Sequence, residues 1–207
     1  MLEYENKLYD KGYKLICGID EVGRGPLLGP VVTSAVILPV GYYNPEIKDS
    51  KKLSEKKREK LFDIITKDAV SIGIGIVDEK KIDEINIYEA TKVAMKMAID
   101  NLSIKPDYVL IDAMKLDIDI PSNSIIKGDA KSITIAAASV LAKVTRDHIM
   151  DEYDKMYPEY EFALHKGYPT KKHLEKMNIY GILDIYRTTY KPVKDCMERK
   201  KNEVTQK

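Results

Sequence analysis

The chain has 207 residues, and its 34 lysines and arginines nearly balance its 33 aspartates and glutamates, giving a formal net charge of +1. This length suits one domain with a tail and allows a sizeable core, and the balanced charge excludes an overall basic field that would attract nucleic acid. Basic residues nevertheless crowd residues 48–58 and 166–194, where a solvated face and a phosphate contact are both open interpretations.

The first part of the chain predicts three strands and one helix. The strand candidates are rich in valine and isoleucine and are bounded by glycine or proline. A helix separates the second from the third: Ser54 can cap it, and Leu61, Ile64 and Ile65 form its apolar stripe. The three strands are Leu15–Asp20, Val31–Leu38 and Val70–Val77.

The second part predicts short strands between longer helices. Its segments, in order, are a helical region that follows Val77 and stops near Pro106, the strands Tyr108–Asp112 and Ser124–Ile126, a long helix from near Asp129 or Ser132 to about Tyr157, and a helix capped by Thr170 that ends at Gly181. Three strands followed by strands mixed with helices predict an α/β fold with one mixed sheet and helices on both faces. We expect one domain over residues 1–193, including a C-terminal helical segment, and a charged, disordered tail over residues 194–207.

The first strand candidate ends in two adjacent carboxylates, Asp20 and Glu21, and a glycine loop carrying Arg24 follows at once. A strand end that delivers carboxylates beside a loop rich in backbone donors can hold a hard metal ion next to a phosphate. A dinucleotide-binding loop has a different order, with its glycines between strand and helix and its acid about 20 residues later. The order in this chain favours a nuclease-like site.

Two further acids stand at positions that can converge with this pair. Asp112 ends the fourth strand candidate, and Asp129 precedes the longest helix. Packed carboxylates repel one another, so such a cluster needs cations, and magnesium takes oxygen ligands from carboxylates and phosphate. Two such ions about 3.5–4 Å apart can activate water and stabilise a leaving oxygen. For Asp129, the spacing alone equally allows a helix cap.

The sequence offers no other catalytic set. His148, His165 and His173 are isolated from one another in the pattern, which is more typical of surface or hydrogen-bonded residues than of ligands. No serine or cysteine stands on a sharp strand-to-helix turn, and the sequence has neither a Walker loop nor a Cys/His zinc spacing.

Five segments carry long and unusual runs of residues. They are Gly18-Ile-Asp-Glu-Val-Gly-Arg-Gly-Pro26, Asp49-Ser-Lys-Lys-Leu-Ser54, Lys127-Gly-Asp129, Ile135-Ala-Ala-Ala-Ser-Val-Leu-Ala-Lys-Val-Thr-Arg-Asp147 and His165-Lys-Gly-Tyr168. These segments fall in the same order as in the ribonuclease HII family, and over roughly residues 14–192 the chain resembles that family.

The resemblance implies a ribonuclease H-like fold, with a mixed five-stranded sheet flanked by helices. It implies an endoribonuclease that hydrolyses the RNA strand of RNA/DNA hybrids and cuts on the 5′ side of single ribonucleotides in duplex DNA, leaving 5′-phosphate and 3′-hydroxyl ends. The implied cofactor is manganese or magnesium in a two-metal site. The alternatives are another metal-dependent nuclease of the ribonuclease H-like superfamily, and a non-catalytic binder, which would be expected to lack one of the acids.

Carried over residue by residue, the resemblance assigns three groups of side chains. The metal-binding and catalytic carboxylates are Asp20, Glu21, Asp112 and Asp129. The loop that contacts the ribose 2′-hydroxyl is Gly23, Arg24 and Gly25, and the aromatic that packs on the next sugar is Tyr168. The residues on segments that face the substrate backbone are Lys51, Ser139 and Lys143.

One segment near the end departs from the family pattern. Where the family often has Gly-Pro-x-Pro-Ile-His-Arg-x-Ser-Phe, this chain has Gly181-Ile-Leu-Asp-Ile-Tyr-Arg-Thr-Thr-Tyr190. Arg187 is retained, while Tyr186 stands where the family has a histidine. The departure puts the contacts of this segment in question, but not the carboxylates.

The remaining features concern compartment and partners. Cys17 and Cys196 lack the spacing of a zinc site or disulfide framework, the N-terminal residues are acidic, and no run approaches the roughly 18 apolar residues of a membrane span. We therefore expect a cytoplasmic monomer with no membrane association. The partners that the resemblance implies are RNA/DNA hybrids and duplex DNA containing ribonucleotides.

Overall fold

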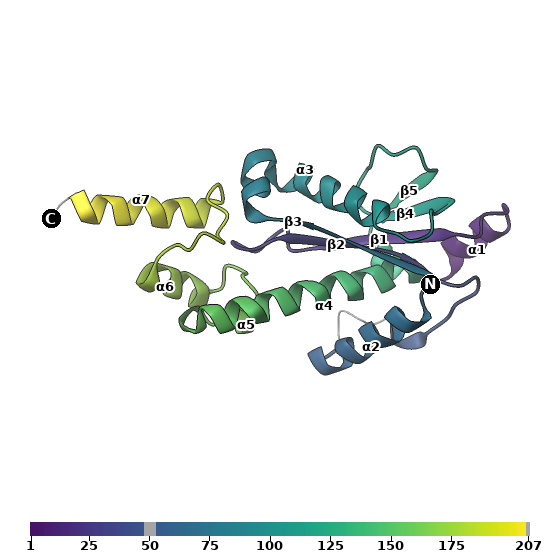
Figure 1. Ribbon diagram of the computed structural model, residues 1–207, viewed down its shortest axis with the longest axis horizontal. Coiled ribbons are helices and arrows are strands. Elements are labelled where there is room, and N and C mark those ends of the chain that lie inside the picture. Colours follow the sequence, from purple (N-terminus) through teal and green to yellow (C-terminus); the bar gives the residue numbers. More distant parts are fainter. Residues whose placement is uncertain (48–52, 206–207) are drawn as a thin grey trace. The chain divides into compact units, whose positions relative to one another are not determined.

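The computed structural model describes residues 1–47 and 53–205 of the chain. The strands predicted from the sequence are confirmed, with their ends displaced by two residues at most. The elements are α1 (Glu3–Tyr9), β1 (Ile16–Val22), β2 (Val31–Ile37), α2 (Glu55–Asp68), β3 (Ser71–Val77), α3 (Glu79–Asp100), β4 (Tyr108–Asp112), β5 (Ser122–Ile125), η2 (Gly128–Ala130), α4 (Ile133–Met156), η3 (Pro158–Tyr160), α5 (Phe162–His165), α6 (Lys171–Tyr180) and α7 (Lys191–Thr205) (Figure 1).

The chain divides into two compact units. The first comprises Met1–Val22, Val32–Ile76 and Thr91–Thr145, and the second comprises Gly23–Val31, Val77–Ala90 and Arg146–Lys207. Four elements, β2, β3, α3 and α4, contribute residues to both units. The expected single domain over residues 1–193 stays a prediction.

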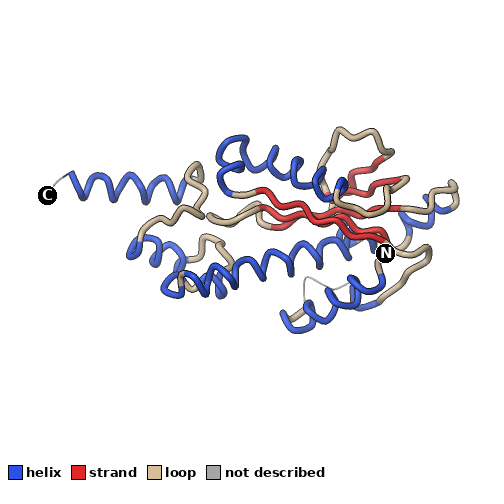
Figure 2. The backbone as a smooth tube through the Cα atoms, viewed as in Figure 1, coloured by secondary structure: helices blue, strands red, loops and turns tan. Residues whose placement is uncertain are grey.

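A five-stranded mixed sheet organises the first unit, as predicted. Its strand order is β3-β2-β1-β4-β5. The central strand β1 pairs antiparallel with β2 and parallel with β4, and β4 pairs parallel with β5. Parallel neighbours cannot be joined by a tight turn. The chain therefore passes through β2, α2, β3 and α3 between β1 and β4. Figure 2 shows the strands side by side, with the helices outside them.

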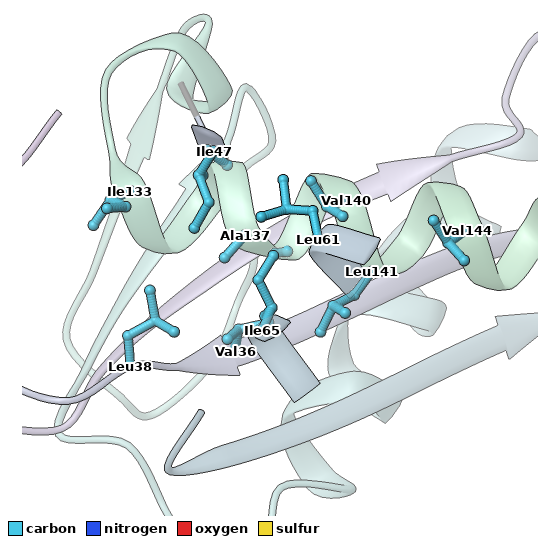
Figure 3. Close-up of a cluster of buried hydrophobic side chains, with 12 residues drawn as sticks. Val36, Leu38, Ile47, Leu61, Ile65, Ile133, Ala137, Val140, Leu141 and Val144 are labelled. Atoms are coloured by element: carbon cyan, nitrogen blue, oxygen red, sulfur yellow. The ribbon is translucent and has the colours of Figure 1, made fainter. Parts of the chain in front are cut away.

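Helices cover both faces of this sheet, because alternate strand residues point to opposite faces. On one face, Leu61 and Ile65 of α2 and the alanine-rich start of α4 bury Val36 of β2 (Figure 3). On the other face, Met95 and Ala98 of α3 pack against residues of β1, β2 and β4. Ser54 is the N-cap residue of α2, but its side chain makes no capping hydrogen bond, which corrects that detail of the prediction.

Two close approaches fix the position of α4 on the sheet. A Cβ atom on Gly18 would lie 2.2 Å from the backbone carbon of Thr134, so only glycine allows β1 and α4 to pack this closely. The helix α1, which the sequence analysis missed, carries the buried Glu5. Glu5 Oε1 accepts hydrogen bonds from the hydroxyls of Ser132 and Thr134, and so anchors the start of α4.

The second unit has its own apolar core, to which α4, α6 and α7 contribute. Thr170 caps α6 by accepting a hydrogen bond from the backbone N–H of His173 at 3.2 Å, as predicted. The segment expected to be a disordered tail contains most of α7, which extends to Thr205. The reason is apolar burial: Val193 and Cys196, three residues apart on one helix face, are both inside this core.

No helix within the described ranges is both long enough and apolar enough to cross a membrane.

Replacing Gly18 by alanine tests the packing of β1 on α4. We expect Gly18→Ala to lower the free energy of unfolding by about 3 kcal/mol, because the new methyl group meets backbone atoms that cannot rotate away. Urea denaturation gives the comparison. Cys17→Ala, on the opposite face of β1, is the control and should cost clearly less; equal losses for the two variants would contradict the close-packing argument.

Candidate functional site

Parallel pairing of β1 and β4 places two of the predicted acids at one edge of the sheet. Ile19 pairs with Ile111, and Asp20 and Asp112 are the next residues of their strands. Asp20 is only 5% exposed. Its Oδ1 atom accepts the backbone N–H of Glu21 at 2.8 Å, and the hydroxyl of Ser139 on α4 also donates to its carboxylate. Asp20 is thus held from its own strand and from the helix above it.

The charges at this edge oppose one another. Burial raises the pKa of Asp20 well above its ordinary value, and the negative charges of Glu21 and Asp112 raise it further. The hydrogen bonds from Ser139 and from the Glu21 backbone act in the opposite direction. The structure therefore brings Asp20, Glu21 and Asp112 close enough for mutual repulsion, which is the arrangement that their positions at strand ends predict.

The fourth predicted acid lies in a turn bonded to this group. Gly128, the first residue of η2, donates its backbone N–H to Asp112 Oδ1 at 2.6 Å, and Asp129 follows it directly. Since α4 begins only at Ile133, Asp129 belongs to η2 and is not the N-cap of the long helix. The cap interpretation of Asp129 is therefore wrong.

A hard divalent cation fits these donors chemically. All four side chains offer carboxylate oxygens, which magnesium and manganese accept as ligands, and a cation would relieve the repulsion around Asp20. In the part of the chain that the structure describes, no three His, Cys, Asp or Glu residues already stand at the spacing of a metal site. The fit therefore rests on the kind of donor and on the charges, not on a preformed cage.

The three residues expected to face the substrate backbone have different surroundings. Ser139 is engaged with Asp20. Lys143 is half-buried on α4 and lies one helical turn after Ser139, so the two side chains share a helix face. Lys51 lies outside the described residues.

The glycine loop, Gly23–Pro30, belongs to the second unit. Gly23 is buried with φ +98°, and a Cβ atom there would lie 2.5 Å from Arg146 Nε, so the fold itself requires glycine at this position. Arg24 and Gly25 are exposed. A Cβ atom on Gly25 would lie 3.4 Å from Cε1 of Tyr168, whose side chain is 40% exposed. The exposed part of the loop and the predicted sugar-packing ring are therefore neighbours.

Two buried histidines hold the segment that carries Tyr168. The rings of His165 and His173 stack with centroids 4.1 Å apart. The Nδ1–H group of His173 donates to the carbonyl oxygen of Tyr168 at 2.8 Å, and its Nε2 accepts the hydroxyl of Tyr186 at 2.8 Å. Tyr186, which stands where the family has a histidine, thus makes a direct polar contact with this pair.

Both histidine rings are neutral in this arrangement. The Nδ1 atom of His165 accepts the backbone N–H of Gly167 at 3.3 Å, and its Nε2–H group donates to the carbonyl oxygen of Tyr160. Burial lowers the pKa of His173 to about 4 and also lowers the pKa of His165. The expectation that these histidines are hydrogen-bonded residues is confirmed.

Sequence reasoning overlooked Arg146, whose guanidinium is fully buried against the glycine loop. A signal for it exists: Ala142, Arg146 and Met150 follow one another at four-residue spacing, and all three are buried. A charged residue in the apolar stripe of a helix requires polar partners inside the protein.

Comparison with known proteins assigns the chain to a family. A family model described as Ribonuclease HII matches residues 17–193. The chain belongs to the ribonuclease HII family. The enzyme is 58% identical over 199 residues to a ribonuclease HII of Bacillus cereus, covering 96% of this chain and 77% of that protein. It is 59% identical over 197 residues to the protein of the same name from Enterococcus faecalis, covering 95% of this chain and 77% of that protein.

A solved structure confirms the fold of this family member. Ribonuclease H2 from Pyrococcus horikoshii OT3 aligns with a TM-score of 0.79 at 28% identity, over 89% of this chain and 97% of that chain. The protein is therefore a ribonuclease H enzyme with the predicted ribonuclease H-like fold.

Removing one charge tests the repulsion among the carboxylates. In chelator, we expect Asp20→Asn to raise the free energy of unfolding on the order of 1 kcal/mol, because the amide keeps the Oδ1 acceptor and removes the buried charge. Urea denaturation of both proteins checks this, with the exposed Asp119→Asn as the control. A less stable Asp20→Asn protein would show that repulsion does not dominate here.

The buried histidine predicts a stability change on the acid side. The folded pKa of His173, about 4, lies below its ordinary value of 6.5, so the unfolded chain binds more protons between these values. Stability should therefore fall as pH drops from about 6.5 to about 4, by roughly 3 kcal/mol from this group.

Denaturation midpoints between pH 7 and pH 4 measure this loss. His173→Gln should show a smaller loss than the wild type, whereas Gln in place of the exposed His148 should leave the pH dependence unchanged. Parallel curves for wild type and His173→Gln would contradict the assignment.

Proposed function

We propose that this enzyme hydrolyses the RNA strand of RNA/DNA hybrids and cuts on the 5′ side of single ribonucleotides in duplex DNA, leaving 5′-phosphate and 3′-hydroxyl ends. The observation that carries the proposal is the exposed Arg24-Gly25 apex beside the half-exposed ring of Tyr168, in a family that acts on RNA/DNA substrates. This is a surface suited to a sugar and its neighbour, whereas a base edge would need directed side-chain donors and acceptors.

The proposed metal ligands are the four carboxylates Asp20, Glu21, Asp112 and Asp129. Their oxygen atoms suit magnesium or manganese in a two-metal site, and the repulsion that raises the pKa of Asp20 favours cation binding. Bound cations would supply an activated water and stabilise the leaving oxygen. The chain's own contribution is to orient the carboxylates: Ser139 fixes Asp20, and the N–H of Gly128 fixes Asp112.

The proposed reader of the 2′-hydroxyl is the loop Gly23-Arg24-Gly25. A 2′-hydroxyl both donates and accepts hydrogen bonds, so backbone groups can satisfy it, and Gly25 has no Cβ atom to keep a sugar away. The ring of Tyr168 offers a flat surface to the neighbouring sugar, where a second 2′-hydroxyl would be crowded. This pairing favours a ribonucleotide followed by deoxyribose.

Basic residues complete the proposed interface. Lys143, on the same helix face as Ser139, suits a phosphate of the substrate backbone. The lysines between residues 166 and 176 form ion pairs with Asp151, Glu161 and Glu175, and would exchange these carboxylates for phosphate on binding. We propose that the enzyme acts as a cytoplasmic monomer.

Cleavage of three duplexes tests the proposal. The duplexes contain one ribonucleotide, four ribonucleotides or DNA alone. The wild type should cut 5′ of the single ribonucleotide in magnesium or manganese and stop in chelator, with on the order of 10⁴-fold discrimination against DNA. Tyr168→Ala should lose most activity at the single site, and Asp112→Asn should be inactive while remaining folded.

Two results would count against this function. If the wild type cut only long RNA tracts, the proposed activity at single ribonucleotides would be contradicted. Full single-site activity of Tyr168→Ala would remove the proposed role of the ring while leaving hybrid cleavage in place.

A further inference from the structure

Two arginines of the second unit are buried in an unusual way. Arg146 and Arg187 are both 0% exposed. In the described part of the chain, their hydrogen-bond partners are carbonyl oxygens and one tyrosine hydroxyl, with no carboxylate among them. Burying two positive charges without acidic partners is costly. We therefore expect these two arginines to have a structural purpose that offsets the cost.

Arg187 spans the whole glycine loop. Its Nε and Nη2 atoms donate to the carbonyl oxygen of Gly29 at 3.0 and 2.8 Å, and Nη2 also donates to that of Gly23 at 2.6 Å. Its Nη1 atom donates to the carbonyl oxygens of Pro26 at 2.9 Å and Arg24 at 3.2 Å. One planar guanidinium therefore holds both ends and the apex of the loop.

Arg146 joins this loop to the segment that carries Tyr168. Its Nε atom donates to the carbonyl oxygen of Pro30 at 3.1 Å and its Nη2 atom to that of Leu28 at 3.2 Å. Its Nη1 atom donates to the carbonyl oxygen of Lys166 at 2.9 Å, two residues before Tyr168. The same side chain thus fixes the position of the glycine loop relative to the segment that carries Tyr168.

We propose that Arg187 and Arg146 are positioning residues that set the preference of this enzyme for ribose. This inference rests on the proposed role of the glycine loop in reading the 2′-hydroxyl. A free loop as rich in glycine as Gly23–Pro30 would have many conformations, and selecting one at binding would cost affinity. The two guanidiniums fix one loop conformation during folding, so the loop already has its binding conformation when the sugar arrives.

Lysine cannot replace arginine in this role. Arginine presents five N–H donors in a fixed plane, whereas lysine carries three donors on one nitrogen. A lysine at position 187 would keep the charge but could not reach Gly23, Pro26 and Gly29 together. Arg187→Lys therefore separates the effect of fixing the loop from the effect of positive charge.

Binding in chelator measures the preference without the chemistry of cleavage. The dissociation constants of a duplex with one ribonucleotide and of the matching DNA duplex are compared for each protein. We expect the wild type to prefer the ribonucleotide and Arg187→Lys to lose about tenfold of this preference. Since a misplacement of about 1 Å can cost about 100-fold, kcat/KM at the single ribonucleotide should fall by roughly 10- to 100-fold.

Cys196→Ala is the matched control. The thiol of Cys196 lies in the apolar core of the second unit, to which Leu27 and Leu28 of the loop also belong, but its hydrogen bond goes to the carbonyl oxygen of Met177 and not to the loop. Its removal should lower stability and leave the binding preference unchanged. All proteins are compared at a temperature at which circular dichroism shows them folded.

Tyr190→Phe provides a second, milder variant should Arg187→Lys not fold. It removes the one hydroxyl that accepts from Arg187 Nη1 at 3.0 Å and donates to the carbonyl oxygen of Arg24 at 2.8 Å. We expect a loss of roughly threefold in preference, the scale of one weakened hydrogen bond.

The outcomes separate this inference from the proposed function. An unchanged binding preference in folded Arg187→Lys, or in Tyr190→Phe where Arg187→Lys is unfolded, overturns the inference. A wild type without any binding preference overturns it as well. Failure of the wild type to cut at single ribonucleotides overturns the proposed function instead, and is seen in the cleavage experiment alone.

Discussion

Parallel pairing of β1 with β4 is the constraint on which the candidate site depends. The register that places Ile19 opposite Ile111 brings the next residues, Asp20 and Asp112, to one edge of the sheet, where their charges repel. The packing around Asp20 and Asp112 holds the two carboxylates close together in spite of this repulsion. Gly18 lets α4 approach closely enough for Ser139 to reach Asp20, and the backbone of Gly128 holds Asp112. The fold thus maintains a charge conflict that a cation would resolve.

In the second unit, by contrast, the buried charged and polar groups that hold the loop are hydrogen-bonded. Its buried charges, on Arg146 and Arg187, are met by backbone carbonyl groups, and its buried histidines are neutral and hydrogen-bonded. Strong satisfaction of polar groups makes a rigid structure, because a carbonyl group that lost its guanidinium partner would be left buried and unpaired. A rigid loop and ring would suit the proposed recognition of the 2′-hydroxyl group, since ribose and deoxyribose differ in that one group.

The sequence predicts the sheet and the meeting of the strand-end acids well, because both follow from local patterns. Apolar strands, their acidic ends and the capping of α6 by Thr170 can be read from neighbouring residues alone. The support of the site could not be read in this way. Glu5 meets Ser132 across more than a hundred residues, and Arg187 meets Gly23 across an even longer interval, so no local pattern records either contact. Helix α7 was missed for a related reason, since the burial of Val193 outweighs the charged composition of the segment.

The glycines near the site are of two kinds, which selection would treat differently. At positions 18 and 23, an added methyl group meets backbone or buried guanidinium atoms at 2.2 to 2.5 Å, so variation there is lost with the fold itself. At position 25, the same group would make an ordinary contact of 3.4 Å with the ring of Tyr168. In a saturation library selected only for folded protein, position 25 would therefore tolerate alanine, and glycine would return there only under selection for activity. Within one short motif, the glycines at positions 18 and 23 would therefore report on the requirements of folding, and the glycine at position 25 on those of ligand binding.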